Sequence, residues 1–418
     1  MPRRLTWMTV VGFGVVAVSA LIYWWAAKDF DAYRGDFFYL ADAFLHGRTW
    51  LDFAPGPNDV IIGGGDRFYV PFAPFPAIAL MPLVAITGPV TADEIESGVN
   101  AVLAASTVGM GWWLLGRIGV QKLWDRLWLV ALLGFSTQIL WITTRGGVWH
   151  TGHLIATLLT LGCLIELWGK RRAWLIGLLA GAAFLTRAPL AFAVPFYALM
   201  LIPESAWSVA EMRGVVGRAW AAIPWRSWVW LAAGVLPSIA FFFLYNQLRF
   251  DNPLESGYAL ATLPPWLEAQ REQGLFSLSH VPMNLDYLFF HLPQLPFFTS
   301  EETSPAVYEF PFFRPDGLGM SVFLTTPGLL FAIRADWRRP MPWLLLGAAI
   351  LVLIPTLLYY GGGWLQYGYR YFLDSIPFLW AICGLAAVFR GRVSWPWRAV
   401  ILVGLVVMAF APHFAYRI

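Results

Sequence analysis

Two aspartates that follow the first long apolar run of the chain could act on a hydroxyl group. Asp36 lies shortly after the run at residues 6–27, and Asp42 comes later in the same stretch, GDFFYLADAFLHG. A carboxylate beside a hydroxyl group takes its proton as the oxygen attacks a carbon atom. Asp36 is therefore the candidate base, close to a membrane surface, and Asp42 is a supporting residue. The alternative for both is a solvated loop acid.

Two arginines could hold an anionic group. Arg370 stands where GGGWLQYGYRY enters an apolar helix, and Arg187 lies between two short apolar segments. A guanidinium stays charged, so this position is costly unless an anion pairs with it. For Arg370 the partner is either a bound phosphate or Asp374, which lies at i+4 on the same helix face. Arg187 carries the same ambiguity.

Further polar residues could contact a substrate. The HTGH stretch places His150 and His153 at a helix start, at a spacing that also suits a metal ion. No carboxylate or third histidine follows nearby, so we expect no cofactor and leave only a divalent metal open. Glu255 and Tyr258, in NPLESGY, could touch a substrate or belong to a solvated loop.

The elements that would position these residues are membrane helices. The chain has 418 residues, of which 59% are hydrophobic and only 13% are charged, whereas a soluble domain carries roughly a quarter charged residues. We expect an all-α membrane protein, a polytopic bundle of about eleven transmembrane helices with juxtamembrane helices in the first outer loop. The spans are expected near residues 6–27, 97–116, 127–143, 151–168, 173–186, 188–202, 228–245, 319–333, 341–360, 371–389 and 398–412.

The distribution of charge predicts the orientation. The apolar segment 71–87 is interrupted by prolines, and reading it as a juxtamembrane helix places most basic residues on the N-terminal side of the membrane. Basic loops favour the cytoplasm. We therefore expect a multi-pass protein of the cell (inner or plasma) membrane with a cytoplasmic N-terminus. Residues 1–418 form one transmembrane domain, with outer loops at 28–96 and 246–317.

The first outer loop carries a family resemblance. GDFFYLADAFLHGRTWLDF resembles the GT-C superfamily of membrane glycosyltransferases, including the protein mannosyltransferases and the aminoarabinose transferases of lipid A. Those families place an acidic residue just after the first span, and Asp36, Tyr39 and Gly47 stand in comparable positions. Phe37 occupies the place of their second acid.

The resemblance continues along nearly the whole chain. Gly65, Tyr69 and the prolines at 71, 74 and 76 resemble the next motif of those families. GLLAGAAFLTRAP, YNQLRFDNPLESGY and YGYRYFLDSIPFL, which contains Tyr369, resemble later segments.

This resemblance implies an inverting hexosyl- or pentosyltransferase that uses a polyprenyl-phosphate sugar donor. The acceptor would be a hydroxyl group of a glycan, lipid or protein on the non-cytoplasmic face, and no nucleic acid is expected as a partner. Asp36 would be the catalytic base, Arg370 and Arg187 would bind the donor phosphate, and no metal ligand is assigned. The candidate substrate-binding residues are Tyr39, Asp42, Tyr69, His150, His153, Glu255, Tyr258 and Tyr369.

Two other classes remain as alternatives. A transporter or flippase of a lipid-linked saccharide needs polar groups through the membrane thickness, whereas the ionisable residues here lie mainly at the ends of the apolar runs. A scaffold subunit of a cell-envelope complex would keep its function when the outer acids are mutated.

Overall fold

The computed structural model describes residues 2–28, 35–56, 58–203, 224–294, 313, 315 and 317–415. Within these ranges the chain is mostly helical, and its single sheet is a two-stranded antiparallel hairpin. Up to residue 167 the elements are α1 (Pro2–Ala27), α2 (Asp36–Leu45), β1 (Ile61–Ile62), β2 (Phe68–Tyr69), α3 (Phe75–Thr87), α4 (Pro89–Glu94), α5 (Glu96–Ile118), α6 (Leu123–Phe135), α7 (Ile139–Arg145) and α8 (Val148–Leu167).

The remaining elements include several short 3-10 helices. They are α9 (Ala173–Phe184), η1 (Ala188–Ala193), α10 (Val194–Met200), α12 (Trp225–Phe250), α13 (Pro265–Arg271), η4 (Leu278–His280), α14 (Val281–Leu285), the π-helix η5 (Asp286–Phe290), α15 (Val322–Thr325), η7 (Pro327–Arg334), α16 (Pro340–Leu358), η8 (Arg370–Asp374), α17 (Ile376–Arg390), α18 (Trp395–Ala409) and α19 (Ala411–Ala415).

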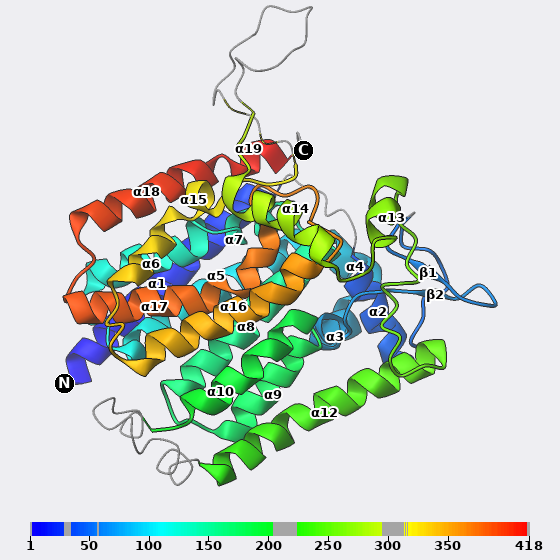
Figure 1. The fold of residues 1–418 in the computed structure, drawn as a ribbon, viewed down its shortest axis with the longest axis horizontal. Helices are drawn as coiled ribbons and strands as arrows, with labels where there is room; N and C mark the ends of the chain where they lie inside the picture. The colour runs from blue at the N-terminus through cyan, green and yellow to red at the C-terminus, as the bar shows by residue number, and fades with distance from the viewer. Residues whose placement is uncertain are drawn as a thin grey trace, which may run out of the picture.

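The long helices form one bundle. They run side by side along the longest axis of the molecule, and α12 follows its lower edge (Figure 1). At one end lie α2, α3, α4, α13 and the β1–β2 hairpin; we call this the loop end. The chain begins at the opposite end, where α9 and α12 also start.

The described helices are those of a membrane protein. Six of them are long and apolar enough to cross a membrane, and the number becomes seven if the bent pair α6 and α7 forms one span. All eleven expected spans fall on helical segments, but several of these segments are too short to establish eleven crossings. The expected span 127–143 contains a 45° bend between α6 and α7, and the one at 319–333 consists of the short helices α15 and η7.

Glycines end two of the long helices. The backbone of Gly119 after α5 has φ 108°, and that of Gly391 after α17 has φ 70°. Both are left-handed conformations that glycine adopts without steric cost, and they commonly terminate a helix. These stops place the ends of α5 and α17 together, where Lys122 donates a hydrogen bond to the carbonyl of Gly391.

A small separate core fixes α2 at the loop end. Phe37, Phe38 and Leu40 are buried against Leu80 of α3 and against Val148 at the start of α8. Gly152 of α8 faces the Phe37 ring, and a Cβ atom there would lie 3.8 Å from it, in ordinary van der Waals contact. The expected helix in segment 71–87 is present as α3, which packs on α2. Of the expected outer loops, residues 29–34, 57, 295–312, 314 and 316 lie outside the described ranges.

Candidate functional site

Asp36 occupies the first position of α2 and is only 1% exposed. The residue before it, Gly35, faces the Asp93 carboxylate so closely that a Cβ atom would overlap with it. Gly35 therefore allows a second acid to approach the backbone beside Asp36. The small core around Phe37 anchors the same helical turn.

Asp93 and Tyr39 form a polar contact next to this turn. The Tyr39 hydroxyl donates to Asp93 Oδ2 at 3.2 Å. Burial raises the pKa of the Asp93 carboxyl, and the hydrogen bond from Tyr39 opposes that rise. Burial, followed by the nearby charge of Asp93, raises the pKa of the Tyr39 phenol. In both groups burial, which disfavours the charged form, is the largest cause of the raised pKa.

A third acid lies where α5 and α8 begin. Glu96 is 1% exposed and lies within electrostatic reach of Asp36. The Thr151 hydroxyl lies 2.7 Å from Glu96 Oε1 and 3.0 Å from the side-chain oxygen of Asn100. Sequence reasoning missed this cluster. An acid at the head of an apolar run, with a polar residue at i+4 on the same face, is the signal that could have revealed it.

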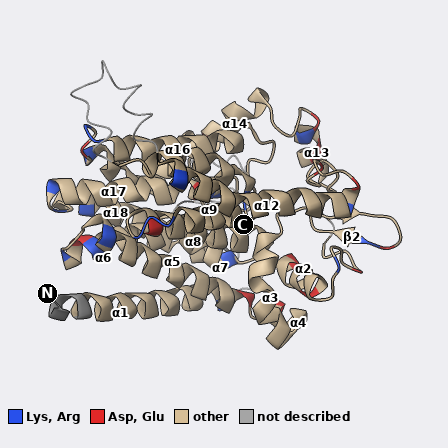
Figure 2. Cartoon of the chain, turned by 90° about the horizontal axis from the view of Figure 1, so that it is seen from below, with Lys and Arg blue, Asp and Glu red and all other residues tan. Residues whose placement is uncertain are grey.

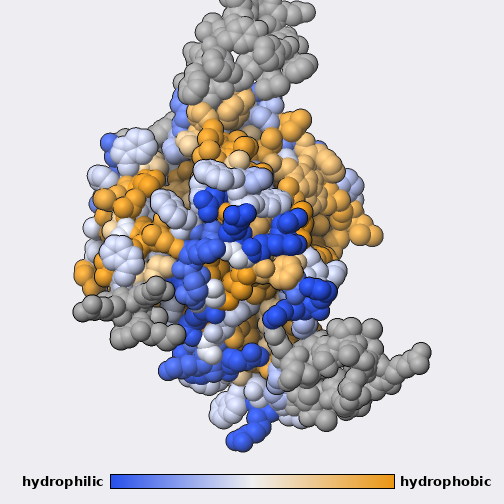
Figure 3. All heavy atoms as spheres, turned by 90° about the vertical axis from the view of Figure 1, so that its left-hand side faces the viewer, coloured by the Kyte–Doolittle hydropathy of each residue, from blue (hydrophilic) through white to orange (hydrophobic). Residues whose placement is uncertain are grey.

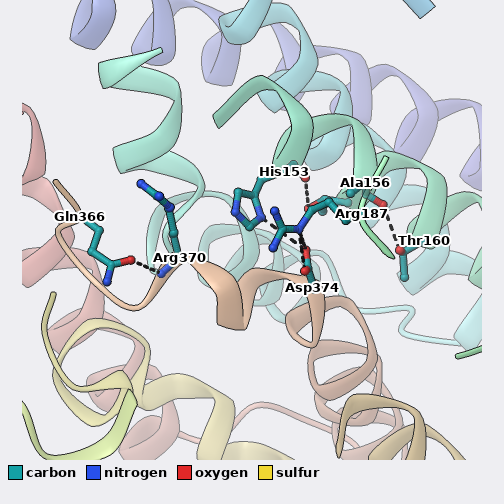
Figure 4. Close-up of polar contacts among 8 residues, drawn as sticks. His153, Ala156, Thr160, Arg187, Gln366, Arg370 and Asp374 are labelled. Atoms are coloured by element: carbon teal, nitrogen blue, oxygen red, sulfur yellow. Dashed lines mark hydrogen bonds and ion pairs between the residues drawn. The ribbon is translucent and has the colours of Figure 1, made fainter. Parts of the chain in front are cut away.

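The same turns of α8 carry both histidines. His153 lies with its Nδ1 3.3 Å from Asp374 Oδ1, and Arg187 Nε donates to both oxygens of Asp374 at 2.8 and 2.7 Å (Figure 4). One turn earlier, His150 Nδ1 contacts the carbonyl of Gly146. Asp374 thus pairs with Arg187 rather than with Arg370, so the i+4 pairing weighed for Arg370 is wrong.

Arg370 differs from Arg187 in having no acidic partner among the residues that the structure describes. Its side chain is directed away from Asp374 (Figure 4), and Nη1 donates to the carbonyl of Trp364 at 2.8 Å. In the described part of the chain, no carboxylate lies within ion-pair distance of it, and Nε lacks a hydrogen-bond partner. Arg370 is nevertheless only 6% exposed and lies within electrostatic reach of His150. It is a buried positive charge that no carboxylate of a described residue compensates.

An aromatic ring connects the two arginines. The guanidinium carbons of Arg187 and Arg370 lie 5.2 and 5.3 Å from the centroid of the Tyr371 ring. Tyr371 also contacts the His153 ring, with 5.9 Å between centroids. A ring face within about 6 Å attracts a cation, so Tyr371 helps to hold both arginines in place. Tyr258 lies within electrostatic reach of Arg187.

The acid Glu96 and the Arg187–Asp374 pair both contact the first turns of α8, through Thr151 and His153. Phe37 packs next to Asp36 and faces Gly152 of α8, and the adjacent His153 contacts Asp374. A hydroxyl group near Asp36 and an anion near Arg370 would then both lie near the first turns of α8. This arrangement suits proton removal combined with anion binding.

Comparison with family models, with curated proteins and with solved structures finds no match in any of the three. Support for the function that the family resemblance implies therefore has to come from the geometry of the site.

Several expected site residues have structural partners elsewhere. Asp42 lies on the surface of α2 with its Oδ2 3.9 Å from Arg48, so it does not share a site with Asp36. Tyr69 is buried against the ring of Phe250. Glu255 accepts a hydrogen bond from the backbone of Gly257 within its own loop. The hydroxyl of Tyr369 donates to Asn284 at 3.1 Å, and its ring lies 5.9 Å from that of Tyr371.

The possible metal ligands and the two cysteines lie apart from one another in groups too small to bind a metal ion, as far as the described residues show. Among the described residues, no group of three His, Cys, Asp or Glu side chains is arranged to hold a metal ion. The pair His150 and His153 therefore gains no third ligand there. Cys163 and Cys383 are both free and buried.

Proposed function

We propose that the chain is an inverting glycosyltransferase that takes a sugar from a polyprenyl-phosphate donor and transfers it to an acceptor hydroxyl group outside the cytoplasm. The observation that carries the proposal is the buried guanidinium of Arg370, which has no carboxylate partner in the described structure. Burying an unpaired charge costs several kcal/mol. A bound anion removes that cost, and a phosphate oxygen matches the donor geometry of a guanidinium.

Besides an anion-binding group, the reaction needs a general base, and Asp36 supplies it. The acceptor oxygen attacks the anomeric carbon, the bond from that carbon to the phosphate oxygen breaks, and polyprenyl phosphate leaves with the electron pair. Asp36 takes the proton of the acceptor hydroxyl. Arg370 stabilises the negative charge that develops on the departing phosphate. Arg187 directs its Nε to Asp374, so its part is to order the ring of Tyr371 and to add positive charge nearby.

The distribution of charge supports placing this site outside the cytoplasm. Figure 2 shows Lys and Arg gathered at the end where the chain begins, whereas many acidic residues surround α2, α4 and α13 at the loop end. Cytoplasmic loops carry the excess of basic residues. The loop end then faces away from the cytoplasm, where nucleotide sugars do not reach and a lipid-borne donor is required.

The test is transfer by purified protein carrying Asp36→Asn. This variant should bind polyprenyl-phosphate sugar with unchanged affinity but lose transfer, by roughly 10²- to 10⁴-fold for the loss of a general base. Asp42→Asn is the matched control, because Asp42 lies on the surface of the same helix, and it should keep full activity. Full activity of Asp36→Asn would remove the mechanism.

The same preparation separates the enzyme from a flippase of lipid-linked saccharide. Reconstituted into vesicles, a flippase would move the labelled donor between leaflets without changing it. The proposal requires instead that the sugar appears on the acceptor and that free polyprenyl phosphate accumulates.

A further inference from the structure

A cavity of about 550 Å³ opens at the end of the bundle opposite the loop end. It lies between the first turns of α9 and α12 and is lined by Arg171, Ala173, Trp174, Arg226, Ser227 and Trp230. Helix α9 runs from this cavity toward Arg187, over a length of roughly 20 Å at 1.5 Å per residue. The cavity is therefore separate from the candidate site.

Close packing of two helices creates the cavity. A Cβ atom at Gly177 would overlap the carbonyl of Leu231, and one at Gly234 would overlap the carbonyl of Trp174. The backbones of α9 and α12 thus touch one turn beyond the cavity. Before that contact the two helices carry large side chains, and the space between them stays open.

The two arginines of the cavity have no acidic partner within the described part of the chain. Arg171 donates through Nη2 to the carbonyl of Met200 at 2.5 Å, and within the described ranges neither Arg171 nor Arg226 lies in ion-pair distance of a carboxylate. Their neighbour Arg172 is paired with Glu166 at 2.7 Å. Two guanidinium groups at one cavity are therefore available to a ligand with negative charge.

The surroundings of the cavity are suited to lipid. Trp174 is 47% exposed and Trp230 is 57% exposed, as expected for rings at the boundary between headgroups and acyl chains. Leu178 follows Trp174 at i+4 on the same face of α9 and is also exposed. An acyl chain would continue along this face. Figure 3 shows this end of the molecule, where hydrophilic side chains are bordered by hydrophobic ones.

We propose that this cavity binds the phosphate of an anionic phospholipid in the leaflet at this end of the bundle. The guanidinium groups of Arg171 and Arg226 contact the phosphate oxygens, because arginine pairs with phosphate through two parallel hydrogen bonds. Trp174 and Trp230 flank the glycerol region. A water-soluble phosphate would use the arginines but leave the exposed apolar face beside them without a partner.

Native mass spectrometry of the full chain in detergent tests the proposal. The protein is titrated with phosphatidylglycerol, with phosphatidylcholine and with glycerol phosphate. Wild-type protein should retain phosphatidylglycerol in preference to the other two. Arg171→Gln with Arg226→Gln should weaken that binding roughly tenfold or more, since each basic residue near an anionic lipid surface strengthens binding about fivefold.

Two further variants complete the test. Arg390→Gln with Arg392→Gln removes the same charge from the exposed C-terminal end of α17 and the turn after it and should bind phosphatidylglycerol as the wild type does. Ser227→Trp fills the cavity without changing charge and should weaken binding as well, which keeps the test informative if the arginine pair does not fold. Equal losses in the cavity pair and the control pair would overturn the proposal. So would glycerol phosphate that binds as tightly as the lipid.

Discussion

Arg187 and Asp374 form an ion pair with a buried carboxylate and a half-buried guanidinium, although 187 positions separate the two residues in the sequence. Arg187 Nε lies 2.8 Å from Oδ1 and 2.7 Å from Oδ2 of Asp374. The Asp374 side chain is 1% exposed, and His153 contacts it from a third segment. Arg187 follows α9, Asp374 lies in η8, and His153 lies in α8, so these contacts hold three segments together. They therefore fix the position of η8, which also carries Arg370.

Replacing one member of this pair should destabilise the protein strongly. Asp374→Asn leaves the Arg187 guanidinium in a buried setting without its counter-charge, and breaking such a pair costs about 3–5 kcal/mol. We expect a lower unfolding temperature in detergent, measured by the fluorescence of the many tryptophans. The double variant Arg187→Met with Asp374→Leu should recover much of the loss, because it removes both charges. Equal stability of Asp374→Asn and wild type would contradict a structural role for the pair.

Replacing Arg370 should weaken donor binding without lowering the stability of the protein. Arg370→Met removes a buried charge that has no carboxylate partner among the described residues, so the free energy of unfolding should stay the same or rise. Binding of the polyprenyl-phosphate donor should weaken by about 1.5–3 kcal/mol, the usual size of a hydrogen bond to a charged group. Isothermal titration measures the second quantity and thermal unfolding the first.

Arg249 provides the control for this prediction. It is also buried, but it donates to the carbonyl of Val70 at 3.0 Å and to the side chain of Asn246 at 2.9 Å. Arg249→Met should therefore lower stability and leave donor affinity unchanged. If Arg370→Met behaves like Arg249→Met, Arg370 is a structural residue and the phosphate assignment is wrong.

The sequence predicts the helices well because their signal is local. Apolar runs, flanking aromatic residues and the glycines after α5 and α17 all lie within one element. The bend between α6 and α7, and the short helices α15 and η7, could not be predicted, because packing against neighbouring helices fixes them rather than composition. A span count from hydropathy therefore exceeds what the helix lengths support.

The site was predictable in its residue types but not in its pairing. Asp36, Arg187 and Arg370 could be singled out because charge beside an apolar run is costly. Helix periodicity suggested Asp374 as the partner of Arg370, whereas the fold gives it to Arg187. Contacts over such sequence separations depend on how α8, α9 and η8 pack. Glu96 was missed for a simpler reason, since it was counted as the last residue of an outer loop.

Asp93 should make the stability of the protein depend on pH. Burial raises the pKa of its carboxyl in the folded state, so the folded state binds this proton more tightly than the unfolded state does. This contribution to stability increases as the pH falls through the raised pKa toward about 4, the value for an unfolded aspartate. Asp93→Asn should thus be more stable than wild type at neutral pH, and the difference should shrink to zero near pH 4.

The Tyr39 hydroxyl offers a second variant for this prediction. Its hydrogen bond lowers the pKa of Asp93, so Tyr39→Phe should steepen the dependence of the unfolding temperature on pH between neutral pH and about pH 4. Unfolding temperatures at a series of pH values give both comparisons. A difference between Asp93→Asn and wild type that stays constant over this range would show that Asp93 does not contribute.

Gly35 should be essential for placing Asp36. A Cβ atom at position 35 would overlap the Asp93 carboxylate, so Gly35→Ala must displace either Asp93 or the first turn of α2. A shift of about 1 Å in a reacting group lowers a rate by roughly 10²-fold. We expect the transfer rate at saturating donor to fall by about this factor while donor affinity, which we have proposed to depend on Arg370, is preserved. Gly98→Ala is the control, because a Cβ atom there meets open space. It should keep its activity and gain about 0.5–1 kcal/mol of helix stability, whereas equal activity of the two variants would show that the contact between Gly35 and Asp93 does not position the base.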